Sequence, residues 1–215
     1  MEPSEAASKN KPAQVAIMPL AYFPPIKYFQ LMLKHKSVVF DVHEHFHKQF
    51  FYNRCVISGP NGAQKLSIPI IHKGVRTALK DVRISYESNW RAIHWRGFEA
   101  AYRRSPYFEF YEHYFSPIYS DFKPTFLFEW NMKLLEIMNT IFGNKIHFSF
   151  TTEYIESYPH ANDYRALAAP SVLAANPIQI PKYLQVFEER NGFINNLSIV
   201  DLLFCEGNNM LQYLK

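Results

Sequence analysis

The densest group of reactive side chains in the sequence lies between Asp41 and Pro69. Three alternating histidines open this stretch, and polar residues, a cysteine and a turn follow. In chain order the residues of interest are His43, His45, His47, Lys48, Gln49, Asn53, Arg54, Cys55 and the turn Pro60-Asn61-Gly62. Imidazole, ammonium, guanidinium and thiol groups this close together predict a functional site, although they do not name its reaction.

The three histidines allow two interpretations. An H-x-H spacing presents two imidazoles on one face of a strand, which is a common way to bind zinc, but a catalytic zinc needs a third protein ligand. An imidazole also titrates near neutral pH, so His45 alone can serve as a general base. The second interpretation requires fewer residues, and we expect His45 to be catalytic and no metal to be bound.

The residues after the histidines are suited to an anionic substrate. A guanidinium such as that of Arg54 forms paired hydrogen bonds to two phosphate oxygens, and Lys48 adds charge. Asn53 and Arg54 also fit a role as polar ties within a hairpin. Cys55, next to Arg54, is either a nucleophile with a lowered pKa or an inert buried thiol, and its apolar neighbours favour the thiol.

A second group of cations lies at a helix junction. Arg103-Arg104-Ser105-Pro106-Tyr107 places two arginines beside a predicted helix start, which fits either an anion clamp or charges in solvent. The remaining candidates come from turns that we expect near the pocket. We therefore predict a substrate-binding set of Tyr22, Pro24, Asn61, Arg104 and Tyr107.

The elements that position these residues follow from the pattern of apolar side chains. Residues 15–20 and 37–42 read as buried strands, and residues 26–35 between them carry apolar positions at helical spacing. This order is a βαβ unit, whose strands pair in parallel and whose ligands bind at the carboxyl ends of the strands. Residues 50–58 and 65–71 flank the Pro-Asn-Gly turn and predict a hairpin.

The rest of the chain predicts helices with a few short strands. We expect strands at 82–85, 146–150 and 183–187, and helices at 90–104, 106–115, from Pro124 to Gly143, and after Ser198. Residues 157–179 contain several prolines and no clear period, so we expect an irregular excursion. Together these segments predict a single α/β domain, residues 15–215, with a mixed sheet, a βαβ start, a central hairpin and covering helices.

Composition narrows the class of protein. The net charge is +4, from 23 basic and 19 acidic residues, and the basic residues are scattered among the acids without a run of five or more, so a nucleic-acid binder is not expected. Two cysteines favour a reducing compartment, and no apolar run is long enough to span a membrane. Residues 1–14 are polar, without the apolar middle of a signal peptide, and predict a disordered tail on a cytoplasmic protein. Aromatic residues make up 17% of the chain, which fits either a ring-filled core or an aromatic-lined pocket.

Several motifs resemble one known family. YFPPIKYF, VVFDV, EHFHKQ, NRCVI, NG and LSIP occur in this order, followed by the pattern W, H and AYRRSPYF and by a long C-terminal segment, YLQVFEERNGFINNLSIVDLLFCEG. This order is similar to that of the short bacterial members of the WbqC-like family, and the resemblance extends from Val15 onward. The matching polar positions are Lys48, Asn53, Arg54 and Gly62, whereas the full histidine triplet departs from the family pattern.

The resemblance implies a role in making surface polysaccharides, because members are associated with the corresponding gene clusters. Some members are proposed to transfer an acyl or aminoacyl group to a sugar amine. We therefore expect a group-transfer enzyme acting on an amino-sugar or sugar-nucleotide, and the motifs leave its cofactor unknown. A non-catalytic module that binds a sugar-nucleotide or a protein partner is the alternative, because no unambiguous nucleophile or cofactor motif is present.

Overall fold

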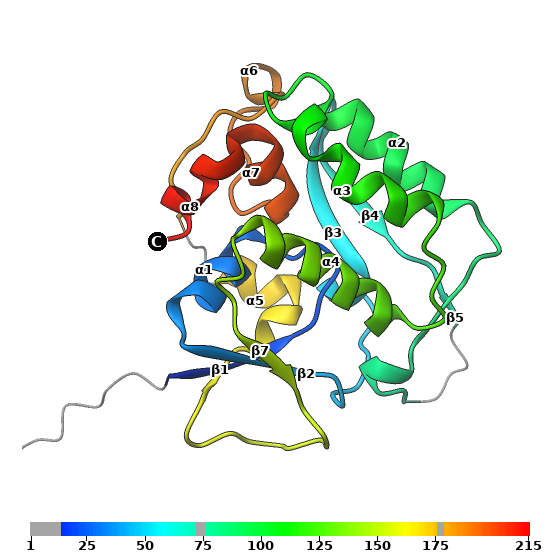
Figure 1. The fold of residues 1–215 in the computed structure, drawn as a ribbon, viewed down its shortest axis with the longest axis vertical. Coiled ribbons are helices and arrows are strands. Elements are labelled where there is room, and N and C mark those ends of the chain that lie inside the picture. The colour runs from blue at the N-terminus through cyan, green and yellow to red at the C-terminus, as the bar shows by residue number, and fades with distance from the viewer. Residues whose placement is uncertain (1–13, 72–75, 176–178) are drawn as a thin grey trace, which may run out of the picture.

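The described part of the chain begins with the βαβ unit that the sequence predicts. The computed structural model describes residues 14–71, 76–175 and 179–215. Strands β1 (Val15–Pro19) and β2 (Ser37–Asp41) pair in parallel, with Val15 opposite Ser37 and Pro19 opposite Asp41. Helix α1 (Ile26–Lys34) connects them (Figure 1). It buries its apolar side, including Phe29 and Met32.

Two short strands complete a four-stranded parallel sheet of order β7-β2-β1-β8. Strand β7 (Phe148–Phe150) pairs with β2, and β8 (Asn162–Asp163) pairs with the free side of β1. The chain thus extends the sheet in one direction from β1 and then returns to its other side. In sheets of this kind the reversal point, here between β1 and β8, is where ligands bind.

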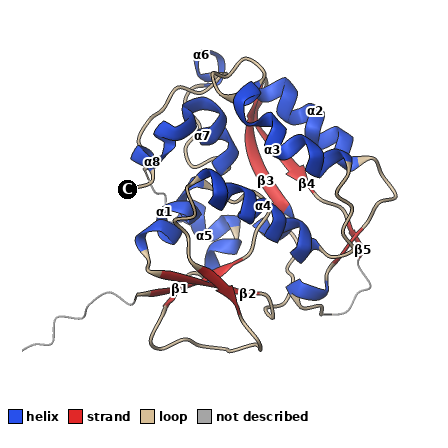
Figure 2. Cartoon of the chain, in the orientation of Figure 1, coloured by secondary structure: helices blue, strands red, loops and turns tan. Residues whose placement is uncertain are grey.

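The predicted hairpin forms a sheet of its own. Strands β3 (Arg54–Gly59) and β4 (Gly62–Ser67) pair antiparallel around Pro60-Asn61, and Gly62 has φ +100°, a conformation that costs glycine little. The expected second arm divides after Ser67, because β5 (Ile70–Ile71) pairs with β6 (Arg83–Ile84) instead. Parallel and antiparallel strands are therefore both present, but in separate sheets rather than in one (Figure 2).

Three helices follow in the order expected. Helix α2 (Trp90–Tyr102) packs against β3 and against α3 (Phe108–Ser120), and α4 (Leu127–Ile141) lies over the ends of β1 and β2. The predicted start of α3 at Pro106 is wrong, because the Ser105 hydroxyl donates to the Tyr102 carbonyl at 2.7 Å and closes α2 instead of capping α3. The predicted stop of α4 is confirmed by Gly143 and Asn144, both at positive φ.

The C-terminal third departs most from expectation. The segment predicted as irregular, 157–179, contains β8, the 3-10 turn Arg165–Ala168 and α5 (Pro170–Ala175). The strand expected at 183–187 does not form. Helices α6 (Glu188–Asn191), α7 (Ile199–Glu206) and α8 (Met210–Tyr213) close the described chain. Of the predicted tail only Gln14 is described, and its carbonyl accepts from the backbone of Lys36 and Ser37.

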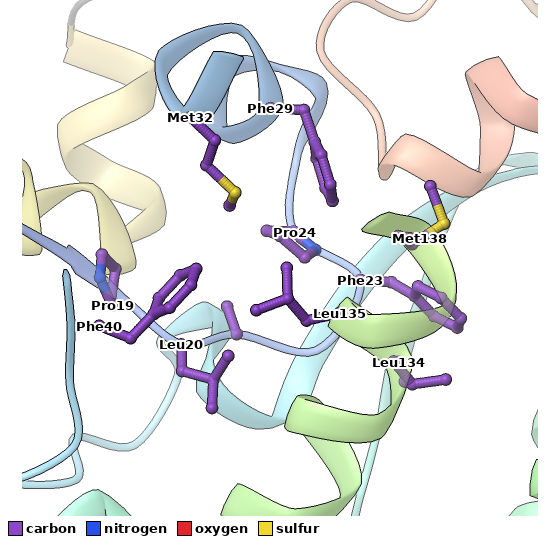
Figure 3. A pocket seen from close by; sticks show the side chains of 11 residues that line it. Pro19, Leu20, Phe23, Pro24, Phe29, Met32, Phe40, Leu134, Leu135 and Met138 are labelled. Atoms are coloured by element: carbon purple, nitrogen blue, oxygen red, sulfur yellow. The ribbon is translucent and has the colours of Figure 1, made fainter. Parts of the chain in front are cut away.

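Aromatic rings are the largest side chains of the core. Tyr22, Tyr28, Phe29, Phe40 and Trp130 are among the largest fully buried side chains. A small apolar gap remains between α1, α4 and the end of β1, with Leu20, Phe40 and Leu135 around it (Figure 3). Its free volume is about 10 Å³, the size of one water molecule, so it is a packing defect and not a ligand site. None of the described helices is both long enough and apolar enough to span a bilayer.

Candidate functional site at the carboxyl edge of the parallel sheet

The carboxyl ends of the parallel strands bring together polar residues from distant parts of the chain. Asp41 is the last residue of β2, Thr151 follows β7 directly, and Asp163 is the last residue of β8. Arg165 lies two residues beyond Asp163, in the 3-10 turn after β8. This edge is where ligands bind in open parallel sheets, which makes it the first place to look for a site.

Asp41 is the centre of this cluster, and its side chain is fully buried. Its Oδ1 accepts hydrogen bonds from the backbone amides of His43 and Glu44, each at 3.0 Å, and from the Thr151 hydroxyl at 3.2 Å. Its Oδ2 accepts from Arg165 Nη1 at 2.9 Å. A buried carboxylate is costly unless it is paired and hydrogen-bonded, and here both oxygens are satisfied.

Arg165 links the carboxylates of Asp41 and Asp163 to the loop that follows β7. It donates to Asp163 from Nε at 3.0 Å and from Nη2 at 2.6 Å, and to the carbonyls of Ile155 and Glu156 at 2.9 Å each. The hydrogen bonds that Arg165 donates to Asp163 raise the pKa of Arg165, and in return Arg165 holds the pKa of Asp163 below its usual value although burial opposes this. With every N–H group engaged, Arg165 positions the edge and has no donor left for a substrate.

Glu44 differs from these paired groups. Its Oε2 is buried and makes no hydrogen bond within the described part of the chain. Burial raises the pKa of Glu44 to about 7, and the charge of Asp41 adds to this, whereas the Tyr52 hydroxyl lowers it. A carboxyl group with a pKa near 7 exchanges protons readily at neutral pH, which is the property of a general base or acid.

Two buried tyrosines lie beside Glu44. Tyr28 and Tyr52 are fully buried, and both hydroxyls lack a partner among the described residues. Burial raises the pKa of both, and the charge of Glu44 raises each further, so both remain neutral and able to donate. Glu44 and the Tyr52 hydroxyl lie close enough for each to shift the pKa of the other, although neither Glu44 Oε2 nor the Tyr52 hydroxyl has a hydrogen-bond partner in the described regions. Buried polar groups are nearly always hydrogen-bonded, so three unpaired ones in one place mark a position for a polar ligand group.

The unpaired polar atoms continue from Tyr52 into the next residues. Asn53 donates from Nδ2 to the Ile68 carbonyl at 2.7 Å, while its Oδ1 is buried without a partner. The Nε of Arg54 is also buried and unpaired, and Asn131 donates to the Tyr52 carbonyl at 2.8 Å but leaves its Oδ1 unpaired. Six of the nine such atoms in the described regions belong to Tyr28, Glu44, Asn131 and the consecutive residues 52–54, so they are concentrated in a few segments of the chain.

The predicted histidines lie at the rim of this group. His43 shares a hydrogen bond of 3.0 Å with the Thr151 hydroxyl, whereas His45 is exposed and stacks on Tyr154, with ring centres 6.2 Å apart. His47 is exposed beside Phe50, and Lys48 is exposed as well. No three His, Cys, Asp or Glu side chains converge as metal ligands within residues 14–71, 76–175 and 179–215.

The predicted substrate-binding residues are not brought to this edge together. Tyr22 is fully buried, and its hydroxyl lies 2.9 Å from His94 Nδ1 and 2.6 Å from the Tyr119 hydroxyl. Pro24 is buried as well. Asn61 is exposed at the hairpin turn, where it accepts a 3.4 Å hydrogen bond from Arg190.

Arg104 and Tyr107 lie at the junction of α2 and α3. Arg104 is exposed beside the segment 184–189. Tyr107 packs so closely against Gly207 that a Cβ there would lie 2.6 Å from its ring. The residues of the predicted anion clamp thus lie beside the C-terminal segments of the chain.

Neither cysteine offers a nucleophile. Cys55 and Cys205 are both free and buried, and burial raises the pKa of each thiol well above its usual value. A thiol in this state is not a thiolate at neutral pH. Of the two interpretations of Cys55, the inert buried thiol is the one that the structure supports.

Sequence reasoning missed the main residues of the edge. Asp41 and Glu44 lie next to the histidines that drew attention, and the position of Asp41 at a strand end is a signal that favours it. Tyr28 and Tyr52 look like ordinary core residues in the sequence. Arg165 lies in the segment that was predicted to be irregular, so no local pattern indicates it.

The chain matches a protein-family model. No curated protein and no solved structure shows a significant match to the chain. Residues 21–178, which contain every residue of the carboxyl edge described above, match the model of one protein family. The chain belongs to the WbqC-like protein family.

Proposed function

We propose that the protein is a group-transfer enzyme that moves an acyl or aminoacyl group onto an amino-sugar or sugar-nucleotide, in the cytoplasmic stage of surface-polysaccharide biosynthesis. The observation that carries this proposal is Glu44, whose carboxyl group has a pKa of about 7 at the carboxyl edge of a parallel sheet. Base catalysis is most effective when the pKa of the base is near the working pH.

In the proposed reaction the acceptor's neutral amine attacks the carbonyl carbon of the donor. A C–N bond forms, the bond to the donor's leaving group breaks, and Glu44 accepts the proton that the amine loses and passes it to the leaving group. The hydroxyls of Tyr28 and Tyr52 are the available donors for the carbonyl oxygen, on which negative charge develops. No protein nucleophile is needed, which agrees with the buried thiols.

The earlier candidates have supporting roles in this proposal. Arg54, with its unpaired Nε, and the exposed Lys48 attract the anionic part of a sugar-nucleotide. Asn53 orients the substrate through its unpaired Oδ1. His45, exposed at the rim, becomes a second proton carrier rather than the base itself.

The first experiment identifies the donor and acceptor. Thermal-shift measurements with nucleotide-sugars, acyl-coenzyme A compounds and aminoacyl donors should reveal stabilisation by at least one donor and one acceptor. Ligand at about ten times its Kd stabilises a protein by about 1.4 kcal/mol, which such a measurement detects.

The decisive test is Glu44→Gln, with the exposed Glu87→Gln as the control. If Glu44 is the base, turnover should fall by about 10²-fold or more while binding of the acceptor is retained. Wild-type kcat/KM should rise with pH and level off above about 7, as Glu44 loses its proton. Unchanged turnover in Glu44→Gln would remove Glu44 from the chemistry.

A non-catalytic module that binds a sugar-nucleotide or a protein partner is the second candidate. It is favoured by the position of two hollows lined by described residues, of about 580 and 550 Å³, which lie away from this edge. For this candidate Glu44→Gln should leave ligand binding intact, and no transfer product should form with any donor and acceptor pair that binds.

A further inference from the structure

The larger of those hollows lies between α1 and α8, away from the carboxyl edge. Its volume is about 580 Å³, within the usual range for small-molecule sites. Four leucines supply its apolar surface, namely Leu31, Leu33, Leu211 and Leu214. The Gln30 amide donates to the Tyr213 carbonyl at 2.9 Å, so α1 and α8 are tied together across the hollow.

Cations surround this apolar surface. Lys215 lines the hollow, and so do three further lysines: Lys27 and Lys34, which lie two turns apart on α1, and Lys145, from the connection between α4 and β7. None of the three takes part in an ion pair within the described regions, and no Asp or Glu lines the hollow. Burial and the charge of Lys34 together lower the pKa of Lys27, because its positive charge has no compensating partner.

Charge and shape together select the ligand. Uncompensated ammonium groups attract phosphate, and an apolar surface beside them accommodates a hydrocarbon or ring. A bilayer is flat and does not fill a concave hollow, so a small molecule fits better than a membrane surface. Lys145 precedes β7, at the amino edge of the sheet, so this hollow is separate from the Glu44 edge.

We propose that the α1–α8 hollow is a binding site for a small phosphate ester, whose phosphate contacts Lys27, Lys34 and Lys145 and whose apolar part lies on the leucines. This site does not depend on the proposed transferase activity, and it adds a second ligand position to the fold.

Calorimetry on the full chain tests the proposal with three probes that separate charge from apolar contact. Octyl phosphate carries both features, inorganic phosphate carries only the charge, and octyl glucoside carries only the chain. We expect octyl phosphate to bind at least about tenfold more tightly than either of the others. The double variant Lys27→Gln/Lys34→Gln should weaken octyl phosphate binding by about tenfold or more.

The matched control is Lys80→Gln/Lys133→Gln, which removes the same charge from exposed lysines that pair with Asp81 and Glu136. Binding by this control should stay within about twofold of wild type. An equal loss in both double variants would show a general charge effect and overturn the site. Equal affinity for octyl phosphate and octyl glucoside would overturn the role of the lysines.

Two further measurements complete the test. Lys145→Gln changes a single exposed residue outside any helix, so a weakened affinity in this variant supports the site even if the double variant unfolds. The proposed site would be overturned if Lys145→Gln binds octyl phosphate with unchanged affinity and if octyl phosphate leaves the chemical shifts of α1 and α8 in the wild-type protein unchanged. Cosedimentation with phosphatidylglycerol vesicles without binding of octyl phosphate would replace the small-molecule site by a membrane-docking face.

Discussion

Two carboxyl groups three residues apart show how local environment assigns different roles. Asp41 has both oxygens fully hydrogen-bonded, to two backbone amides, a hydroxyl and a guanidinium. Glu44 leaves Oε2 buried and unpaired, with its pKa raised to about 7 by burial. Asp41 therefore fixes the backbone that presents Glu44, and Glu44 keeps its ability to exchange a proton.

The raised pKa of Glu44 predicts a pH-dependent stability. Folding favours the protonated form of this carboxyl group. Its contribution to the free energy of unfolding is therefore fully present below pH 4.5, the ordinary pKa of a glutamate, and is lost as the pH rises through about 7. Glu44→Gln mimics the protonated form. The variant should match wild type near pH 4 and be more stable by about 1–3 kcal/mol near pH 8. Urea denaturation of both proteins between pH 4 and pH 8 measures this difference. A difference in stability that does not change with pH would contradict the raised pKa.

Arg54 provides a test of where the anionic substrate binds. Its Nε makes no hydrogen bond within the described chain, so Arg54→Lys breaks none there and should change stability by less than about 1 kcal/mol. Lysine keeps the charge but loses the paired geometry, so affinity for the anionic ligand should fall by at least about tenfold. Calorimetry with and without ligand separates the effects. A lowered melting temperature with unchanged affinity would assign Arg54 to the hairpin instead.

Among the elements, the segment around residues 183–187 is held by side chains instead of strand pairing. Asp201 of α7 is fully buried and accepts from Tyr183 at 2.6 Å and from Tyr102 at 2.7 Å, and the Gln185 amide donates to the Tyr183 hydroxyl at 3.1 Å. These bonds join α2, α7 and the segment. An alternation of apolar residues resembles a strand, but here the hydrogen-bonding partners are a carboxylate and an amide.

Removing one of these hydrogen bonds should loosen the C-terminal third. Tyr183→Phe leaves Asp201 Oδ2 without its hydroxyl donor in a buried position, which costs about 1–3 kcal/mol. The exposed Tyr154→Phe is the control and should change stability by less than about 0.5 kcal/mol. Urea denaturation measures both. Equal stabilities for the two variants would mean that the Tyr183 hydroxyl does not hold the segment.

Elements with a strong local pattern are the ones that the sequence predicts correctly. Strands β1 and β2, α1 and the stop of α4 at Gly143-Asn144 depend on apolar period and backbone preference, which are local properties. Strand β8 is two residues long and forms only because β1 offers it an edge. The predicted start of α3 was wrong because the Ser105 hydroxyl donates to the Tyr102 carbonyl in the preceding turn, a contact that the local sequence pattern does not indicate.

At the scale of the whole molecule, the candidate site is assembled from parts that are far apart in the sequence. Lys48, Asn53 and Arg54 are near one another in the chain, and their types alone indicate a site. Arg165 reaches Asp41 across 124 residues, and the pKa of Glu44 depends on burial by neighbours that no short window contains. The chemistry of the site was thus partly visible in the sequence, but its geometry was not.

The sheet order has a consequence for how the chain folds. Strand β1 lies near the start of the described chain, yet its second neighbour, β8, is made only after about three quarters of the residues. During synthesis β1 can pair early with β2, while its other edge stays open until β8 arrives. Contacts between such distant residues form slowly, and an open edge invites pairing with other chains. The newly made protein therefore passes through a period in which its central strand is exposed to aggregation.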